Sequence, residues 1–249
     1  MNLPKRWEKE IQLLRHKKYR IALGKTVIEG KRLVGEALVY ARPQIHFLLA
    51  HESWDSWVAQ FACDIPVYRC HDILWSRLSI DQAPSRLLAL IDYAPSQTLP
   101  ANMAERIVIA NHLQDPGNLG TLLRSAEAFG CDLVITDSQT VSSDNPKVIK
   151  ASMGSVFRLN LIENQSFNSV FSYLARIPLY GLSAHRGDSI WELKSRDKWA
   201  LIVGNEGNGI SDEWLPHIRP LTIPLSGAVE SLNAAHSVSI ALAILNRPL

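Results

Sequence analysis

The chain has 249 residues, of which 47% are hydrophobic and 20% charged, and its net charge is +2. These proportions are typical of a globular protein with one large or two ordinary domains, and they exclude a disordered chain. No apolar run reaches the roughly 18 residues that a membrane-spanning helix needs, so we expect no membrane partner.

The positive charge is concentrated at the start of the chain. Residues 1–20 contain seven lysines and arginines and two glutamates, a net charge of +5, so the other residues sum to −3. A basic segment on a near-neutral body is typical of a protein that binds a polyanion such as RNA, and equally of a solvated amphipathic helix. In the first case, Lys17, Lys18 and Arg20 are the candidate RNA-binding residues.

The start of the chain and the cysteines indicate the compartment. Met1 to Arg6 lead into a charged segment rather than the apolar core of a signal peptide, so the expected location is the cytoplasm. Cys63, Cys70 and Cys131 show no CxxC pair and no metal-ligand spacing. We expect free thiols with structural roles, and no metal site.

Two prolines that flank polar residues, at 95–100, mark a linker. We therefore expect an N-terminal domain of residues 1–95, a linker of residues 96–104 and a C-terminal domain of residues 105–249. In the first domain, runs of helical and strand character alternate, which predicts a small α/β unit. Its expected helices are 3–19, 28–40 and 54–62, and its expected strands are 45–50, 67–68 and 87–91.

The second domain repeats strand and helix more regularly. The expected strands are 107–110, 133–136, 159–162, 179–182, 201–203 and 221–223. The expected helices lie near 117–129, 145–152, 166–175, 211–217 and 230–246. Continuously apolar strands with helices between them predict a parallel sheet covered on both faces. Ligands of such sheets bind beyond the carboxyl ends of the strands, so the loops after Ala110, Val203 and Ile223 are the candidates.

The loop after Ala110 leads into a helix that Gly130 is expected to end. Asn118 lies at the start of this helix, where the helix dipole favours an anion. Arg124 lies off the apolar arc of the helix and offers a bidentate phosphate donor. The alternative is a capping asparagine and an ordinary surface arginine.

The loop after Val203 contains Gly204, Gly207 and Gly209. Glycines allow backbone groups to approach a ligand closely, so this loop is typical of a cofactor site. Ser211 is the expected N-cap of the helix that follows. The spacing differs from GxGxxG and follows a late strand, which disfavours a dinucleotide fold, and the chain contains no P-loop motif.

The loop after Ile223 begins with Pro224, which ends the strand. Ser231 and Asn233 then place small polar groups at the start of the last helix. Taken alone, they are more typical of ordinary helix caps than of a binding site.

Together, and in this order, the three loops resemble the signature motifs of the SpoU (TrmH) family of RNA ribose methyltransferases. The residues that carry the resemblance are Asn118-x-Gly120-x-x-x-Arg124, Ala151-Ser152-x-Gly154, Gly204-Asn205-Glu206-Gly207-x-Gly209 and Ile223-Pro224-Leu225-x-Gly227-x-x-Glu230-Ser231-Leu232-Asn233. The resemblance covers residues 107–246. Residues 28–38, Leu78-Ser79 and Ala83-Pro84 are similar to the family's small RNA-binding domain.

The resemblance implies a parallel α/β sheet whose C-terminal segment forms a trefoil knot. The residues alone predict an open doubly wound sheet, because knots are nearly absent from protein folds. The resemblance also implies a homodimer formed through the C-terminal domain, with the active site at the interface. The implied reaction transfers a methyl group from S-adenosylmethionine to a ribose 2′-hydroxyl of RNA.

The resemblance assigns two sets of site residues. The cofactor-binding set is Gly204, Asn205, Gly209, Ile223 and Leu232. The catalytic set is Arg124, Asn118, Glu206, Ser231 and Asn233. A guanidinium is a poor base, so Arg124 is also a candidate to polarise the 2′-hydroxyl, hold a phosphate or stabilise an alkoxide. His236, on the last helix, either faces the site or is an ordinary helix histidine, and the second interpretation is favoured.

The resemblance favours ribosomal RNA over transfer RNA as the substrate, because the shorter members of the family that act on transfer RNA often lack an N-terminal domain. A catalytically inactive RNA-binding protein is a further alternative, which the intact polar positions disfavour. A nucleotide-dependent oxidoreductase is disfavoured by the glycine spacing.

Overall fold

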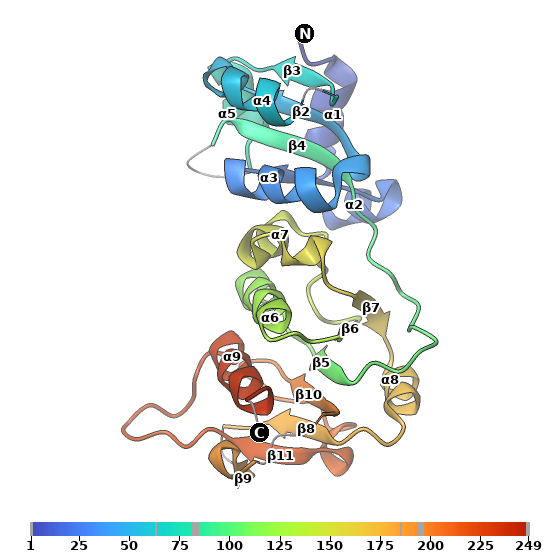
Figure 1. Cartoon of the computed structure of the whole chain (residues 1–249), viewed down its shortest axis with the longest axis vertical. Helices are drawn as coiled ribbons and strands as arrows, with labels where there is room; N and C mark the ends of the chain where they lie inside the picture. The colour runs from blue at the N-terminus through green and yellow to red at the C-terminus, as the bar shows by residue number, and fades with distance from the viewer. Residues whose placement is uncertain (1, 63, 81–84, 185, 194–196, 248–249) are drawn as a thin grey trace. The chain divides into compact units, whose positions relative to one another are not determined.

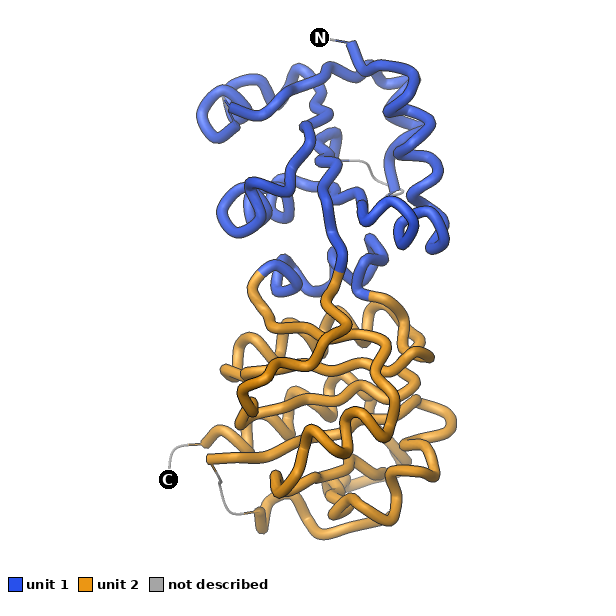
Figure 2. The backbone as a smooth tube through the Cα atoms, turned by 90° about the vertical axis from the view of Figure 1, so that its right-hand side faces the viewer, with its two compact units in different colours: residues 1–94, 143–157 blue, residues 95–142, 158–249 orange. Residues whose placement is uncertain are grey.

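The structure is a computed structural model that describes residues 2–62, 64–80, 85–184, 186–193 and 197–247. It divides into two compact units (Figure 2). Unit 1 contains residues 1–94 and 143–157, and unit 2 contains residues 95–142 and 158–249. Cys63 and the Ala83-Pro84 pair lie outside the described residues.

Unit 1 contains a four-stranded sheet with the order β1-β4-β2-β3. Its strands are β1 (Lys25–Glu29), β2 (Ile45–Ala50), β3 (Val67–Arg69) and β4 (Leu87–Asp92). Strand β4 runs antiparallel to β1 and β2, while β3 is parallel to β2. Five consecutive residues of β4, from Leu87 to Ile91, are buried, as expected for an apolar strand at the centre of a sheet covered on both faces.

The helices of unit 1 complete its core. They are α1 (Lys5–Leu13), α2 (Lys17–Leu23), α3 (Lys31–Tyr40), α4 (Asp55–Phe61), α5 (Asp72–Leu78) and α7 (Pro146–Ser152). Ile11 of α1 and Trp75 of α5 pack with Phe47 of β2 in one hydrophobic cluster. The predicted strands 45–50, 67–68 and 87–91 and the predicted helix 54–62 are confirmed to within a residue or two.

Two predicted helices of unit 1 are wrong in part. The expected helix 3–19 is two helices, because the extended backbone of His16 separates α1 from α2, and α2 continues past residue 19 to Leu23. The expected helix 28–40 begins at Lys31. The preceding residues form β1, and Gly30, with a φ of +105°, turns the chain from strand to helix. Helix α5 was not predicted.

A buried ion pair connects two distant segments of unit 1. The Nε of Arg20 lies 3.2 Å from Oδ1 of Asp144, and the two side chains are 5% and 4% exposed. The contact is electrostatic rather than an aligned hydrogen bond. Arg20 also donates to the carbonyls of Leu14 and Arg15, and Thr26 donates to the carbonyl of Asp144. These contacts hold the segment 143–157 against the N-terminal helices and β1.

Unit 2 contains a seven-stranded sheet in which every pair is parallel (Figure 1). The order is β7-β6-β5-β10-β8-β11-β9. The strands are β5 (Arg106–Ala110), β6 (Leu133–Asp137), β7 (Leu161–Gln165), β8 (Leu179–Leu182), β9 (Asp188–Ser189), β10 (Trp199–Val203) and β11 (Arg219–Thr222). The predicted parallel sheet is confirmed, although β7 begins two residues later than expected.

Helices cover the sheet of unit 2. They are α6 (Pro116–Ala128), α8 (Phe167–Leu174) and α9 (Ala234–Leu245). Helix α8 packs with Ile107, Ile135 and Ile202 in a core cluster. Helices α6 and α9 lie against each other, where the hydroxyls of Ser125 and Ser239 are 2.7 Å apart.

Helix ends in unit 2 agree only partly with the sequence predictions. Gly130, with a φ of +65°, ends α6, and its N–H donates to the Glu127 carbonyl, as expected for a residue after a helix C-cap. The N-cap of α6 is Asp115 rather than Asn118. The helix expected at 211–217 is only the 3₁₀ turn η5 (Leu215–His217), because Pro216 has no N–H to donate to an α-helical hydrogen bond within the segment.

We predict that Asp144→Ala lowers the free energy of unfolding by about 3–5 kcal/mol, because it leaves the buried guanidinium of Arg20 without its counter-charge. The measurement is urea unfolding. The control is Asp72→Ala, which breaks the 3.1 Å pair with Arg86, whose side chains are 45% and 66% exposed. That change is expected to cost less than about 1 kcal/mol. Equal losses in the two variants would contradict the prediction.

Candidate functional site

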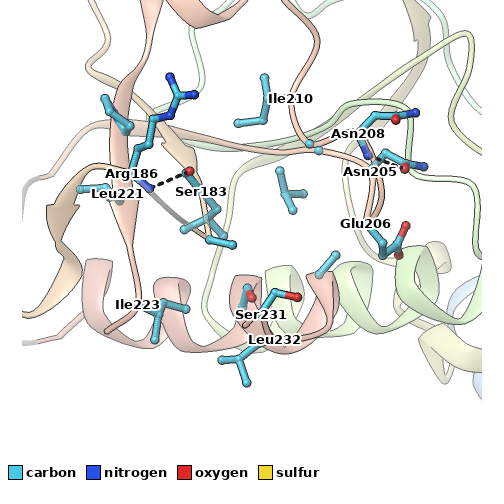
Figure 3. A pocket seen from close by; sticks show the side chains of 18 of the residues that line it. Ser183, Arg186, Asn205, Glu206, Asn208, Ile210, Leu221, Ile223, Ser231 and Leu232 are labelled. Carbon is cyan, nitrogen blue, oxygen red and sulfur yellow. Dashed lines mark hydrogen bonds between the residues drawn. The ribbon is translucent and has the colours of Figure 1, made fainter. Parts of the chain in front are cut away.

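A pocket of about 680 Å³ lies beyond the carboxyl ends of β10, β8 and β11, three neighbouring strands of unit 2. Figure 3 shows Asn205 and Glu206 on one side of it, Ser183 and Arg186 on the opposite side, and Ser231 and Leu232 along its floor. The volume lies in the range of about 300–1,000 Å³ that is typical of small-molecule sites. The position is the one expected for a ligand of a parallel sheet.

The glycine loop after β10 is held closed by its own backbone. Asn205 and Gly209 exchange two backbone hydrogen bonds of 2.9 Å. The Asn205 side chain accepts from the N–H of Gly207 at 2.8 Å and donates to the carbonyl of His112 at 3.1 Å. The loop is therefore a rigid turn that also contacts the loop after β5.

Two glycines of this loop are required by geometry. A methyl group on Gly204 would overlap the backbone carbonyl of Gly209, which folds back over the end of β10. Gly209 has a φ of +69°, which favours glycine. Gly207 has no such constraint, because a methyl group there would meet only the Asn205 side chain, at 3.4 Å.

All five residues predicted to bind the cofactor line the pocket. They are Gly204, Asn205, Gly209, Ile223 and Leu232. The apolar side chains of Ile210 and Leu221 extend the wall, and the glycine loop contributes backbone polar groups. Such a pocket suits a flat ring held between apolar side chains with polar edges that face main chain.

A directed chain of hydrogen bonds joins the three predicted loops. Asn233 is the N-cap of α9, and its side-chain oxygen accepts from the N–H of Ala235 at 2.9 Å. Its amide nitrogen donates to the side-chain oxygen of Asn118 at 2.8 Å. The amide nitrogen of Asn118 then donates to the carboxylate of Glu206. Ser231 lines the same pocket, just before Asn233.

Arg124 is not brought to this network within one chain. It is exposed on α6 and does not line the pocket. Among the described residues, no side chain forms a hydrogen bond or ion pair with it. Six residues separate it from Asn118, which places the two on different sides of the helix.

The three predicted RNA-binding residues have different surroundings. Lys17 and Lys18 are exposed on α2. Arg20 is buried and paired with Asp144, so its guanidinium is not available to a ligand, and its inclusion in the RNA-binding set is wrong. The charge count did not reveal that Arg20 is buried, because its partner Asp144 lies 124 positions further along the chain and the residues near Arg20 give no sign of the pair.

The remaining candidates are structural. His236 is exposed and lies outside the pocket lining, and its backbone N–H donates to Asn233, which agrees with the interpretation of an ordinary helix histidine. Burial raises the pKa of Cys70 to about 11 and that of Cys131 to about 12, so both thiols are unreactive at neutral pH. Within the described ranges, no three metal-ligating side chains cluster, and no helix is long and apolar enough to cross a membrane.

One prediction about the loops around the pocket is wrong, and one loop was missed. Ser211 does not cap a helix; its backbone N–H donates to the buried side chain of Asn111 at 2.8 Å. The loop after β8, which contributes Ser183 and Arg186 to the pocket, was not among the candidates. The available signal was the predicted strand 179–182, but the sequence does not show that β8 lies between β10 and β11.

Comparison with known proteins identifies the fold and the family. The model of the SpoU rRNA Methylase family matches residues 105–243, and that of the MRM3-like substrate binding domain matches residues 8–89. The resemblance found in the sequence is thereby confirmed.

Individual relatives match over most of the chain. The 23S rRNA (guanosine(2553)-2′-O)-methyltransferase RlmP of Bacillus subtilis is 30% identical and aligned over 95% of this chain and 92% of its own length. A TrmH-family structure from Porphyromonas gingivalis has a TM-score of 0.84 and 31% identity, and covers 99% of each chain. The structure of AviRb from Streptomyces viridochromogenes with AdoMet, at 24% identity and a TM-score of 0.84, covers 98% of this chain and 97% of its own and shows the same fold.

We predict that Gly204→Ala destabilises the protein by about 1–3 kcal/mol, the usual cost of forcing a methyl group into a packed site. The loop must open to relieve the overlap with Gly209. Gly207→Ala is the matched control in the same loop and is expected to be nearly neutral. Thermal unfolding of both variants is the measurement, and a neutral Gly204→Ala would refute the close approach.

Proposed function

Because the chain belongs to the SpoU rRNA methylase family, we propose that it transfers a methyl group from S-adenosylmethionine to a ribose 2′-hydroxyl of ribosomal RNA. The observation that carries the proposal is the hydrogen-bonded chain from Asn233 through Asn118 to Glu206 at the edge of the pocket. The test is methyl transfer to total RNA, followed by mapping of 2′-O-methylated positions. Modified transfer RNA without modified ribosomal RNA would redirect the proposal to the alternative substrate.

The pocket fits the cofactor. Main-chain groups at Gly204, Ile223 and Leu232 would hold the adenosine part, while Asn205 and Gly209 keep the loop in shape. The closed turn supports this role, since its own hydrogen bonds hold its backbone groups in place. S-adenosylmethionine supplies an electrophilic methyl group, so the protein has to provide position and electrostatics.

The polar residues are proposed to orient the ribose. Glu206 ends the hydrogen-bonded chain as an acceptor, and its second oxygen remains available to a ribose hydroxyl. Asn118 and Asn233 fix its position, and Ser231 adds a hydroxyl at the same edge. The 2′-hydroxyl that such groups contact is also what distinguishes RNA from DNA.

We propose a homodimer formed through the C-terminal domain, in which Arg124 completes the site of the partner. The support is that Arg124 is exposed and lies outside the pocket of its own chain. We also propose that the C-terminal segment is threaded as a trefoil knot. Two features support the threading: β10 lies between β5 and β8 in the sheet, and α9 packs against α6.

The N-terminal residues are proposed to bind RNA. Residues 8–89 resemble a substrate-binding domain, and the exposed Lys17 and Lys18 supply positive charge for phosphates. An enzyme of ribosomal RNA is needed where ribosomes assemble, so we also propose a cytoplasmic location.

We predict that Arg124→Ala lowers kcat by about 10²–10³-fold, the usual effect of removing one group that stabilises developing negative charge. The affinity for S-adenosylmethionine should stay unchanged, because Arg124 does not line the pocket. Single-turnover methyl transfer and calorimetry with the cofactor are the measurements. Wild-type turnover in this variant would remove Arg124 from the mechanism.

We predict that co-expression of Arg124→Ala with Leu232→Glu restores activity that neither variant has alone. Leu232→Glu blocks the pocket of its own chain but keeps Arg124. In a mixed dimer, the open pocket of the Arg124→Ala chain receives Arg124 from the Leu232→Glu chain, so one of the two sites is intact. Statistical mixing makes about half of the dimers mixed, which leaves about a quarter of all sites intact. The control replaces Leu232→Glu with the double variant Arg124→Ala/Leu232→Glu, which should restore nothing. Absence of rescue would mean that each site is completed within one chain.

A further inference from the structure

Unit 1 has an open groove between helices α3 and α4 that the site described above does not use. Its volume is about 590 Å³. We call it the α3–α4 groove and define it by six of its lining residues: Lys31, Arg32, Val39, Arg42, Trp57 and Phe61.

Aromatic rings form one wall of the groove. Trp57 and Phe61 line the groove, and Trp54, which lies outside the lining, precedes them at helical spacing, so the three share one side of α4 and the turn before it. The rings of Trp54 and Trp57 are 6.2 Å apart at 78°, and those of Trp57 and Phe61 are 5.4 Å apart at 39°. Trp54 donates from its indole N–H to the carbonyl of Ser85 at 2.9 Å. This hydrogen bond positions the Trp54 ring, against which Trp57 packs edge to face.

Aromatic residues at helical spacing usually belong to a hydrophobic core, but this wall is accessible. Phe61 is 44% exposed, and Val39 on the facing helix α3 is 71% exposed. Trp57 is half-buried and lines the groove. Exposed rings beside an exposed aliphatic side chain form a surface suited to a flat apolar ligand.

Positive charge lies at the rim of the groove. Lys31 and Arg32 are exposed at the start of α3, and the Nζ of Lys31 is 5.9 Å from the Trp54 ring. Among the described residues, neither forms an ion pair. Arg42 is paired with Asp64, and Glu36 adds one carboxylate to the lining. The two unpaired cations therefore give the rim a net attraction for an anion.

We propose that the α3–α4 groove binds an unpaired nucleotide of the RNA substrate, with the base stacked on Trp57 and Phe61 and the adjacent phosphate bound by Lys31 and Arg32. The proposal rests on the proposed function, because it assumes that RNA is the substrate. Single-stranded RNA is recognised by bases stacked on aromatic side chains, together with cations that follow the backbone. A duplex cannot use this groove, because its bases are already stacked.

The decisive variant is Val39→Glu, which places a negative charge in the groove on an exposed side chain that the fold does not need. The matched control is Ile73→Glu, because Ile73 is 82% exposed on α5 in the same unit and lies outside the groove. The net charge changes equally in both. The probes are a fluorescein-labelled single-stranded RNA of mixed sequence and a duplex of the same length, measured by anisotropy.

Val39→Glu is expected to weaken single-strand binding about tenfold, as the loss of one stacked base does. Ile73→Glu should stay within about twofold of the wild type, and duplex binding should respond equally to the two variants. Equal effects on the single strand, or no effect of Val39→Glu, would overturn the proposal. A change of oligomeric state in Val39→Glu with unchanged RNA affinity would assign the groove to a second copy of the chain, and would also overturn it.

A second pair of variants separates stacking from charge. Trp57→Phe keeps an aromatic face and should retain most of the single-strand affinity, whereas Trp57→Leu should lose it at unchanged cofactor affinity. In methyl-transfer assays the groove variants should raise KM for RNA and leave kcat unchanged. If the wild type methylates no RNA but this binding pattern holds, the proposed function fails and the groove is still assigned to single-stranded RNA. If the wild type methylates RNA and Val39→Glu has an unaltered KM for RNA, the proposed function stands and the groove proposal fails.

Discussion

The N-terminus of α9 must have its backbone N–H groups satisfied, and the side chain of Asn233 does this. This requirement orients the whole polar network. The Asn233 oxygen faces the helix, so its amide nitrogen points outward and donates to Asn118, whose own nitrogen donates to Glu206. The same three side chains therefore cap α9 and orient the Glu206 carboxylate at the edge of the pocket. A change at Asn233, Asn118 or Glu206 affects the other two.

The sheet order brings the remaining parts of the pocket together. Strands β10, β8 and β11 are neighbours, so the loops at their carboxyl ends converge although they come from separate parts of the sequence. The glycine loop fits against this edge only because Gly204 has no side chain to meet Gly209. Besides the bond from Asn205 to His112, a second connection to the loop after β5 runs through Asn111, a buried amide that accepts from the Ser211 N–H and donates to Asp137.

The sequence predicted those features that depend on local pattern. Continuously apolar strands, Gly130 as a helix end and the pocket role of the glycine loop all follow from neighbouring residues. The failures have non-local causes. The burial of Arg20 depends on Asp144, and the contribution of β8 depends on sheet order. The segment 211–217 has polar residues typical of a helix start, but Pro216 restricts it to a 3₁₀ turn.

Charge alone is a weak guide to RNA contact in this chain, and Arg20 shows why. Two lysines on α2 are exposed, while the arginine three positions after Lys17 is enclosed by the segment 143–157. That segment contains Ala151-Ser152-x-Gly154, one of the motifs that carried the family resemblance. A methyl group on Gly154 would meet the Glu36 side chain at 2.8 Å. The glycine is therefore explained by packing within unit 1, and not every signature residue needs a role in chemistry. The α3–α4 groove is the opposite case, because it combines aromatic rings with cations that form no ion pair among the described residues. Such a combination indicates a nucleic-acid surface more specifically than net charge does.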